Sequence, residues 1–120
     1  MREDTPLHIA ATYNQVEVAR ALVRDIRVEV NALEYRACTT PLHRASRHGH
    51  VGVVDVLLGC NDIRVNALNN LRLTPLHFAA RYGMHEAVAT LLKHPHGALW
   101  LSVRYFSFVS QCSFCRENET

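Results

Sequence analysis

The chain has 120 residues, of which 48% are hydrophobic, and its formal net charge at pH 7 is +2. This length predicts one domain with enough apolar residues to form a core. The small and mixed charge argues against a nucleic-acid-binding protein. The most apolar segment, at 98–109, is too short to cross a bilayer. We therefore expect a partner that is neither a nucleic acid nor a membrane.

The cysteine pattern and the first residues indicate the cellular compartment of the protein. The four cysteines, Cys38, Cys60, Cys112 and Cys115, do not have the regular spacing of a disulfide framework. This favours reduced thiols in an intracellular protein. Residues 1–4 contain no apolar core of a signal peptide. We expect a cytoplasmic or nuclear protein.

The sequence Thr-Pro-Leu-His occurs three times in the chain. The three copies begin at Thr5, Thr40 and Thr74, which are 35 and 34 residues apart, and an Ala follows each His two places later. Thr is a good N-cap, and Pro has a preset backbone angle at the first position of a helix. The motif therefore predicts a short helix at each copy, and its period predicts a stacked repeat architecture.

A second, longer helix is predicted after each motif. Asn14, Gly49 and Gly83 stand at the same distance from the three motifs, and these residue types tolerate the left-handed conformation that ends a helix. The apolar residues that follow share one helical face. They are Val16, Ala19, Leu22 and Val23, then Val51, Val54, Leu57 and Leu58, and then Val88, Leu91 and Leu92. His85 replaces an aliphatic residue in the third copy, so we expect that repeat to pack less well.

The loops after the second helices are also related. Val-Asn-Ala ends the first loop at 30–32 and the second at 65–67. With these loops, the chain resembles the ankyrin repeat, whose signature is Thr-Pro-Leu-His-x-Ala. The resemblance implies an all-α fold, an ankyrin-repeat solenoid of three helix-turn-helix repeats joined by hairpin-like loops. It also implies that the motif Thr and His form local hydrogen bonds that tie neighbouring repeats together.

The expected repeat region covers residues 1–97, with repeats at about 1–36, 37–70 and 71–97. The family usually has an Asp and a Gly at the hairpin tips. Glu34 and Cys38 stand near these places in the first loop, and Asn69 and Arg72 in the second. The geometry of the tips is therefore not predicted.

The remaining residues, 98–120, form a non-repeat C-terminal tail. Apolar residues alternate with polar ones at 101–105, which is a weak strand signal. Cys112 and Cys115 could bind zinc together with His94 and His96, but no second pair has the spacing of a zinc motif. We predict no metal and no cofactor, and we interpret the two cysteines as free thiols.

Catalytic signatures are absent from the sequence. It contains no nucleophile elbow, phosphate loop or paired-carboxylate pattern, so we do not expect an enzyme. In a stacked array, equivalent positions form rows, and the rows beside the core are rich in arginine and aromatic residues. These types are enriched where proteins bind proteins. The predicted partner-binding residues are Tyr35, Arg36, Arg44, Arg47, His48, Leu71, Arg72, Phe78, Arg81 and Tyr82.

The predicted function is protein–protein interaction by a monomer. The resemblance implies that the concave face is the partner site. The arginines favour a partner protein or peptide that is acidic, because Arg44, Arg47, Arg72 and Arg81 can pair with carboxylates. An alternative remains open: the chain could be a non-catalytic docking fragment of a larger multidomain protein, such as an enzyme, a channel or a ubiquitin-ligase adaptor.

Overall fold

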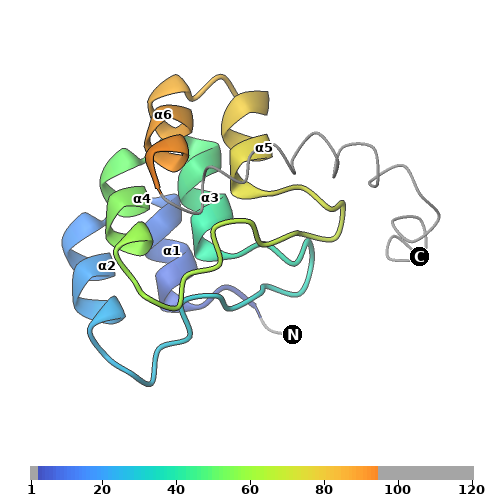
Figure 1. Cartoon of the computed structure of the whole chain (residues 1–120). Coiled ribbons are helices and arrows are strands. Elements are labelled where there is room, and N and C mark those ends of the chain that lie inside the picture. Colours follow the sequence, from blue (N-terminus) through green and yellow to red (C-terminus); the bar gives the residue numbers. More distant parts are fainter. Residues whose placement is uncertain (1–2, 95–120) are drawn as a thin grey trace.

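A computed structural model describes residues 3–94, and these residues form three pairs of antiparallel helices without any strand (Figure 1). The helices are α1 (Pro6–Thr12), α2 (Val16–Val23), α3 (Pro41–His48), α4 (Val51–Leu58), α5 (Pro75–Arg81) and α6 (His85–Lys93). The all-α solenoid of three helix-turn-helix repeats is therefore confirmed. The predictions for the tail, 98–120, and for a zinc site with Cys112 and Cys115 lie outside the described residues.

The helices form two layers. The first helices of the repeats, α1, α3 and α5, contact one another in order, and so do the second helices, α2, α4 and α6. The loops between repeats extend from the side of the first helices (Figure 1). The three first helices and the two loops between repeats therefore lie on the same side of the described part of the molecule.

Each first helix begins at the threonine of the motif. The side chains of Thr5, Thr40 and Thr74 accept a hydrogen bond from the backbone N–H of the motif histidine. In return, the threonine N–H donates to the histidine Nδ1, over 3.2, 3.1 and 3.0 Å respectively. This reciprocal capping starts the three helices in the same way, so equivalent residues point in equivalent directions.

The same histidines connect neighbouring repeats, as the resemblance implied. Nε2 of His8 lies 2.8 Å from the carbonyl oxygen of Thr39, and Nε2 of His43 lies 2.8 Å from that of Leu73. Because Nδ1 accepts a hydrogen bond from the threonine N–H, Nε2 must carry the ring proton and donate to the next repeat. Burial lowers the pKa of both histidines, and that of His43 falls to about 4.

The turns within the repeats use the left-handed region, as predicted. Asn14 has a φ of 58°, and Gly49 and Gly83 both have a φ of 70°. Space also matters at Gly49, because a Cβ atom there would lie 2.7 Å from Sδ of Met84. The middle turn therefore requires glycine both for its backbone conformation and for the approach of the next repeat.

The hairpin tips differ by one residue. The N–H of Glu34 donates to the carbonyl of Thr39, five residues on, whereas that of Asn69 donates to Leu73, four residues on. The additional residue in the longer repeat spacing therefore lies in the first tip. Cys38, with a φ of 58°, and Arg72, with a φ of 61°, occupy a conformation that glycine adopts more easily.

Side-chain hydrogen bonds stabilise both tips. The carboxylate of Glu34 accepts from the N–H groups of Arg36 and Ala37 over 2.9 and 2.6 Å. Burial disfavours its charge, but these backbone hydrogen bonds outweigh burial and lower the pKa of Glu34. In the second tip, Oδ1 of Asn69 accepts from the N–H of Leu71 over 2.9 Å. Glu34 and Asn69 thus accept backbone hydrogen bonds near the tip positions where the family usually has Asp.

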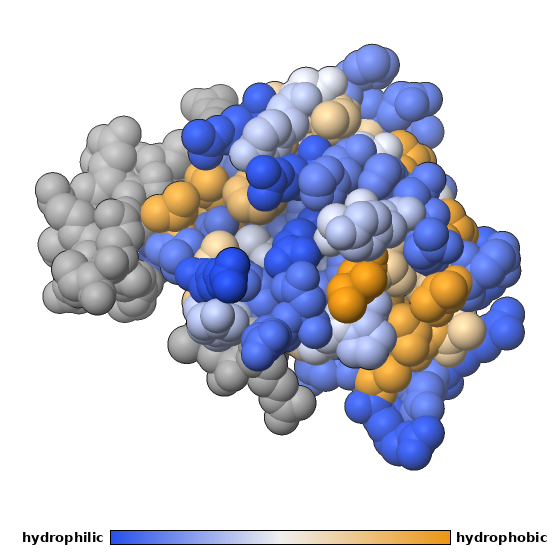
Figure 2. Space-filling model, turned by 180° about the vertical axis from the view of Figure 1, so that it is seen from behind, coloured by the Kyte–Doolittle hydropathy of each residue, from blue (hydrophilic) through white to orange (hydrophobic). Residues whose placement is uncertain are grey.

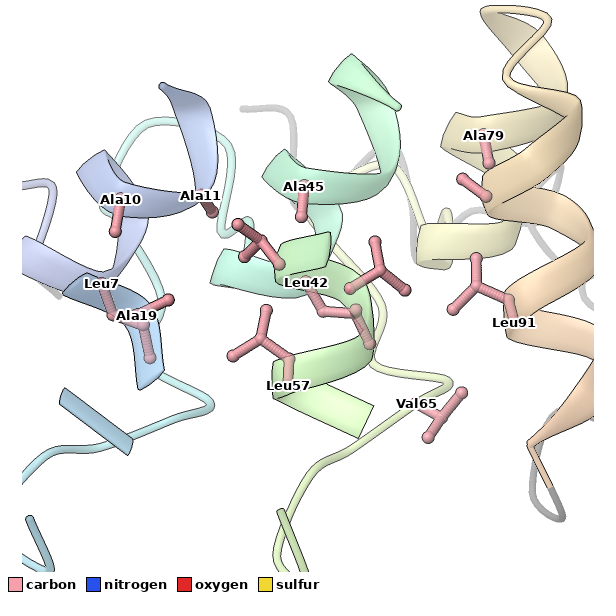
Figure 3. Packing of buried hydrophobic residues seen from close by; sticks show 13 residues of the cluster. Leu7, Ala10, Ala11, Ala19, Leu42, Ala45, Leu57, Val65, Ala79 and Leu91 are labelled. Atoms are coloured by element: carbon pink, nitrogen blue, oxygen red, sulfur yellow. The ribbon is translucent and has the colours of Figure 1, made fainter. Parts of the chain in front are cut away.

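The core consists of rows of equivalent side chains (Figure 3). Ala10, Ala45 and Ala79 are buried between successive first helices, and Leu57 and Leu91 are buried between second helices. Leu22 belongs to the row of Leu57, and Leu76 to the row of the buried Leu42; both lie in terminal repeats, where they are partly buried. His85 is exposed. The hydrophobic core is therefore most complete in the middle repeat.

Candidate functional site

The candidate site lies on the first-helix face, which we define as the outward side of α1, α3 and α5 together with the two hairpin tips. The shared capping geometry places the equivalent positions of these helices in one row. None of these side chains is needed to fill the core. Their chemistry is therefore available for binding.

Arg47, Arg81 and Tyr82 form the centre of this face. The guanidinium carbon of Arg47 lies 5.0 Å from the centroid of the Tyr82 ring, and that of Arg81 lies 6.0 Å from it. All three residues are exposed. The two cations flank one aromatic ring, an arrangement in which the ring attracts both and holds their positions.

Phe78 connects this centre to the buried motif histidine. Its ring makes edge contacts with Tyr82, at a centroid distance of 6.3 Å, and with His43, at 5.2 Å. Phe78 itself is half-buried. The orientation of the exposed Tyr82 is therefore supported by groups that are fixed in the repeat stack.

His48 lies beside the centre. Its ring stacks on that of His50, at 5.7 Å, and Nε2 of His50 bonds the carbonyl of Thr12 over 3.1 Å. Partial burial, together with the charge of Arg47, lowers the pKa of His48. The shift favours the neutral form of the His48 ring, which adds a polar surface beside the arginines.

Arg44 differs from Arg47 and Arg81 because it forms an ion pair within the described residues. Its guanidinium contacts the carboxylate of Asp4 at 2.7 and 3.1 Å, and Oγ1 of Thr12 at 3.0 Å. These hydrogen bonds lower the pKa of Asp4. By contrast, Arg47 and Arg81 form no ion pair within residues 3–94.

The hairpin tips lie at the edge of the face. Arg36 stands 5.6 Å from the ring centroid of Tyr35, and its Nε donates to the Tyr35 hydroxyl over 3.3 Å. Leu71 is exposed and Arg72 is half-buried. The tips are joined, because the N–H of Asn70 donates to the carbonyl of Ala37 over 3.0 Å. They therefore form a continuous edge.

A pocket of about 340 Å³ adjoins the first tip. It is lined by Glu3, Asp4, Ile9, Tyr35, Arg36 and Arg44, together with Glu34. The predicted residues thus fall into two groups, one around Tyr82 and one around Tyr35. Ile9 and Asp4 were missed by the sequence prediction; Ile9 occupies the same row as Arg44 and Phe78, a signal that could have found it.

The described residues contain no group of three or more metal-binding side chains. The longest of the six helices has nine residues, and none could cross a membrane. The rows of arginine and aromatic side chains offer ion pairs, cation–π contacts and apolar area. These are means of binding, and they include no arranged nucleophile and base.

Comparison with protein families gives a match to ankyrin repeats in three copies, over residues 2–69 and 33–99. Similar stretches occur in much larger proteins. Alpha-latrotoxin-Lg1a of Latrodectus geometricus is 34% identical over 79 residues, which are 66% of this chain and 6% of the toxin.

Two further relatives are also much longer than the stretch that matches this chain. The probable E3 ubiquitin-protein ligase XBOS33 of Oryza sativa subsp. japonica is 37% identical over 91 residues, which are 74% of this chain and 17% of the ligase. Human rabankyrin-5 is 30% identical over 94 residues, which are 78% of this chain and 8% of that protein. The chain therefore spans only a small part of the relatives that it matches. The family match, the three capped motifs and the stacked helix pairs show that the chain belongs to the ankyrin repeat family and forms a protein-interaction module.

Proposed function

We propose that the first-helix face binds an acidic segment of a partner protein. The observation that carries this proposal is the position of Arg47 and Arg81, which flank Tyr82 and form no ion pair within the described residues. The two guanidinium carbons lie 5.0 and 6.0 Å from the centroid of the same ring, so one anion beside Tyr82 can approach both. A carboxylate there would form charge-assisted hydrogen bonds with both.

The arrangement also favours affinity. Tyr and Arg are the side chains that most often dominate protein interfaces. Tyr82 and Phe78 are held by ring contacts, and the helices that carry them are capped and stacked. Little conformational entropy is therefore lost when a partner binds.

The other predicted residues extend the proposed interface. Tyr35, Arg36, Leu71 and Arg72 at the tips provide a second contact area beyond the Tyr82 centre. Arg44 contributes less, because a partner carboxylate would have to compete with Asp4. The pocket beside Tyr35 suits a side chain of the partner rather than a small-molecule substrate.

The wider setting is also part of the proposal. We propose a monomer without catalytic activity, located in the cytoplasm or the nucleus, that binds neither nucleic acids nor membranes. The relatives favour a docking role, since the stretch that matches this chain forms only 6–17% of these long proteins. In such a setting the repeats position other domains and perform no chemistry.

Selection from a random peptide library tests the proposal. The peptides that bind the whole chain should include a class rich in Asp and Glu, and the double variant Arg47→Glu/Arg81→Glu should bind this class about tenfold or more weakly, a loss of at least about 1.4 kcal/mol. Affinity is measured by fluorescence anisotropy. The matched control is Arg24→Glu/Lys93→Glu, which changes the net charge equally at exposed positions outside this face.

Two results would overturn the proposal. One is a set of selected peptides without a class rich in Asp and Glu. The other is equal weakening by the two double variants, which would show that net charge alone governs binding. Thermal unfolding of each variant checks that the fold is retained.

A further inference from the structure

Ile26 is fully exposed in the loop after α2. The sequence Asp-Ile-Arg occurs at 25–27 and again at 62–64, but Ile26 lies 21 residues after Thr5, whereas Ile63 lies 23 residues after Thr40. The N–H of Val28 donates to the carbonyl of Asp25, as that of Ile63 donates to Cys60. Val28 therefore occupies the structural place of Ile63, and Ile26 is left in solvent.

An open groove of about 840 Å³ lies beside Ile26, between α2, α4 and the loops that follow them. This volume is in the range of about 300–1000 Å³ that is typical of ligand pockets. The aliphatic residues that line it are Val16, Val23, Ile26, Val28, Val30 and Val56. Figure 2 shows hydrophobic residues on the side of the molecule where the second helices lie, with hydrophilic residues around them.

Glycine in α4 shapes the groove. A Cβ atom at Gly52 would lie 2.9 Å from a methyl group of Val16. Gly52 therefore allows α2 and α4 to approach, and it leaves no side chain to fill the space between them. Val53 and Val54, by contrast, are completely buried in the core.

The charged rim of the groove is acidic. Arg20 is paired with Glu17, and Asp25 is paired with Arg27. The remaining charged lining residues are three carboxylates, which form no ion pair within residues 3–94, and one arginine. They are Glu29, Asp55, Asp62 and Arg24. The rim thus has the opposite charge to the first-helix face.

We infer that this groove is a second docking site, and that it binds a partner-protein segment in which aliphatic residues are flanked by Lys or Arg. Apolar side chains of the segment would cover Ile26 and Val56, and its cations would pair with Asp55 and Asp62. Burial of a fully exposed isoleucine favours binding through the hydrophobic effect. The opposite charges of the two faces would direct acidic and basic segments to different sides of the molecule.

The test uses the full chain carrying Arg47→Ala/Arg81→Ala as bait for a random library of twelve-residue peptides, so that the cationic centre of the first-helix face is removed and no new carboxylates are placed there. The selected peptides should combine Leu, Ile or Val with Lys or Arg. Ile26→Ser and Asp55→Lys, each added to the bait, should weaken their binding about tenfold or more. Ile26→Ser alters a solvent-exposed side chain, so the fold should be unaffected.

Ile9→Ser is the matched control, because Ile9 is an exposed isoleucine on the other face. It should leave the affinity of these peptides unchanged. Selected peptides whose binding is insensitive to both Ile26→Ser and Asp55→Lys would overturn the inference, and so would peptides without basic residues. A version of the peptide with acidic residues in place of its basic ones should bind the Asp55→Lys variant. This result would support direct pairing at Asp55.

Discussion

Acidification from pH 7 to about pH 4 should lower the free energy of unfolding by about 3 kcal/mol through His43 alone. The reason is the fixed protonation state of its ring. Nδ1 accepts from the N–H of Thr40, and Nε2 faces the carbonyl of Leu73. A second proton on Nδ1 would point at the Thr40 N–H, in a site without water access.

The sign of this pH effect follows from the pKa of His43 in the folded chain and in the unfolded chain. The pKa of His43 is lowered from 6.5 to about 4 in the folded chain, mainly by burial. The unfolded chain therefore binds more protons between these values, and stability is complete above pH 6.5 and is lost as the pH falls toward 4. Burial also lowers the pKa values of His8 and His77, which act in the same direction.

Urea unfolding at a series of pH values measures this effect. The variant His43→Gln is less stable at pH 7, but its unfolding free energy should depend less on pH, by about 3 kcal/mol over the same range. A wild-type unfolding free energy that stays constant between pH 6.5 and 4 would contradict the burial of a neutral His43.

The substitution Leu57→Ala should destabilise the chain by about 3 kcal/mol, within the usual range for a buried leucine. Leu57 is completely buried in α4, which contacts α2, α3 and α6. Because three repeats are about the minimum for a stable array, a cavity in the middle repeat should weaken both of its interfaces. The whole array should then unfold at a lower urea concentration, in one transition.

Leu22→Ala provides the comparison. Leu22 occupies the same row in the first repeat but is only partly buried, so its loss should cost about half as much. If Leu22→Ala were as damaging as Leu57→Ala, the description of a core that is most complete in the middle repeat would be wrong. Far-ultraviolet circular dichroism follows both variants.

Local features of the fold could be predicted from the sequence because short-range physics determines them. Thr followed by Pro starts a helix wherever it occurs, and the spacing of Leu57 and its neighbours defines a buried helical face. Asn14, Gly49 and Gly83 signal the turns through their backbone freedom alone. Because these signals repeat, stacking of the repeats buries the apolar faces of neighbouring units against one another.

Long-range pairing could not be predicted in this way. Asp4 and Arg44 are 40 residues apart, and only their positions in the stack bring them together. The tip residues Glu34 and Asn69 depart from the family pattern, and their replacement of Asp becomes visible only through their hydrogen bonds to the backbone. Ile26 appears equivalent to Ile63 in sequence, yet a shift of two residues leaves it in solvent.

The candidate site was predictable in composition but not in detail. Rows of equivalent positions indicated that Arg47, Arg81 and Tyr82 face the same side. Their mutual arrangement, with two guanidinium groups around one ring, depends on side-chain conformations. The ion pair of Arg44 with Asp4 could not be predicted either, because the sequence position of Arg44 gives no sign of it.

The most direct test of the account is to map the binding of a selected acidic peptide by backbone amide chemical shifts in nuclear magnetic resonance spectra of the whole chain. The largest chemical-shift changes should fall on α3, α5 and the hairpin tips, centred on Arg47, Arg81 and Tyr82. Changes confined to α2, α4 and α6, with none at these three residues, would contradict it.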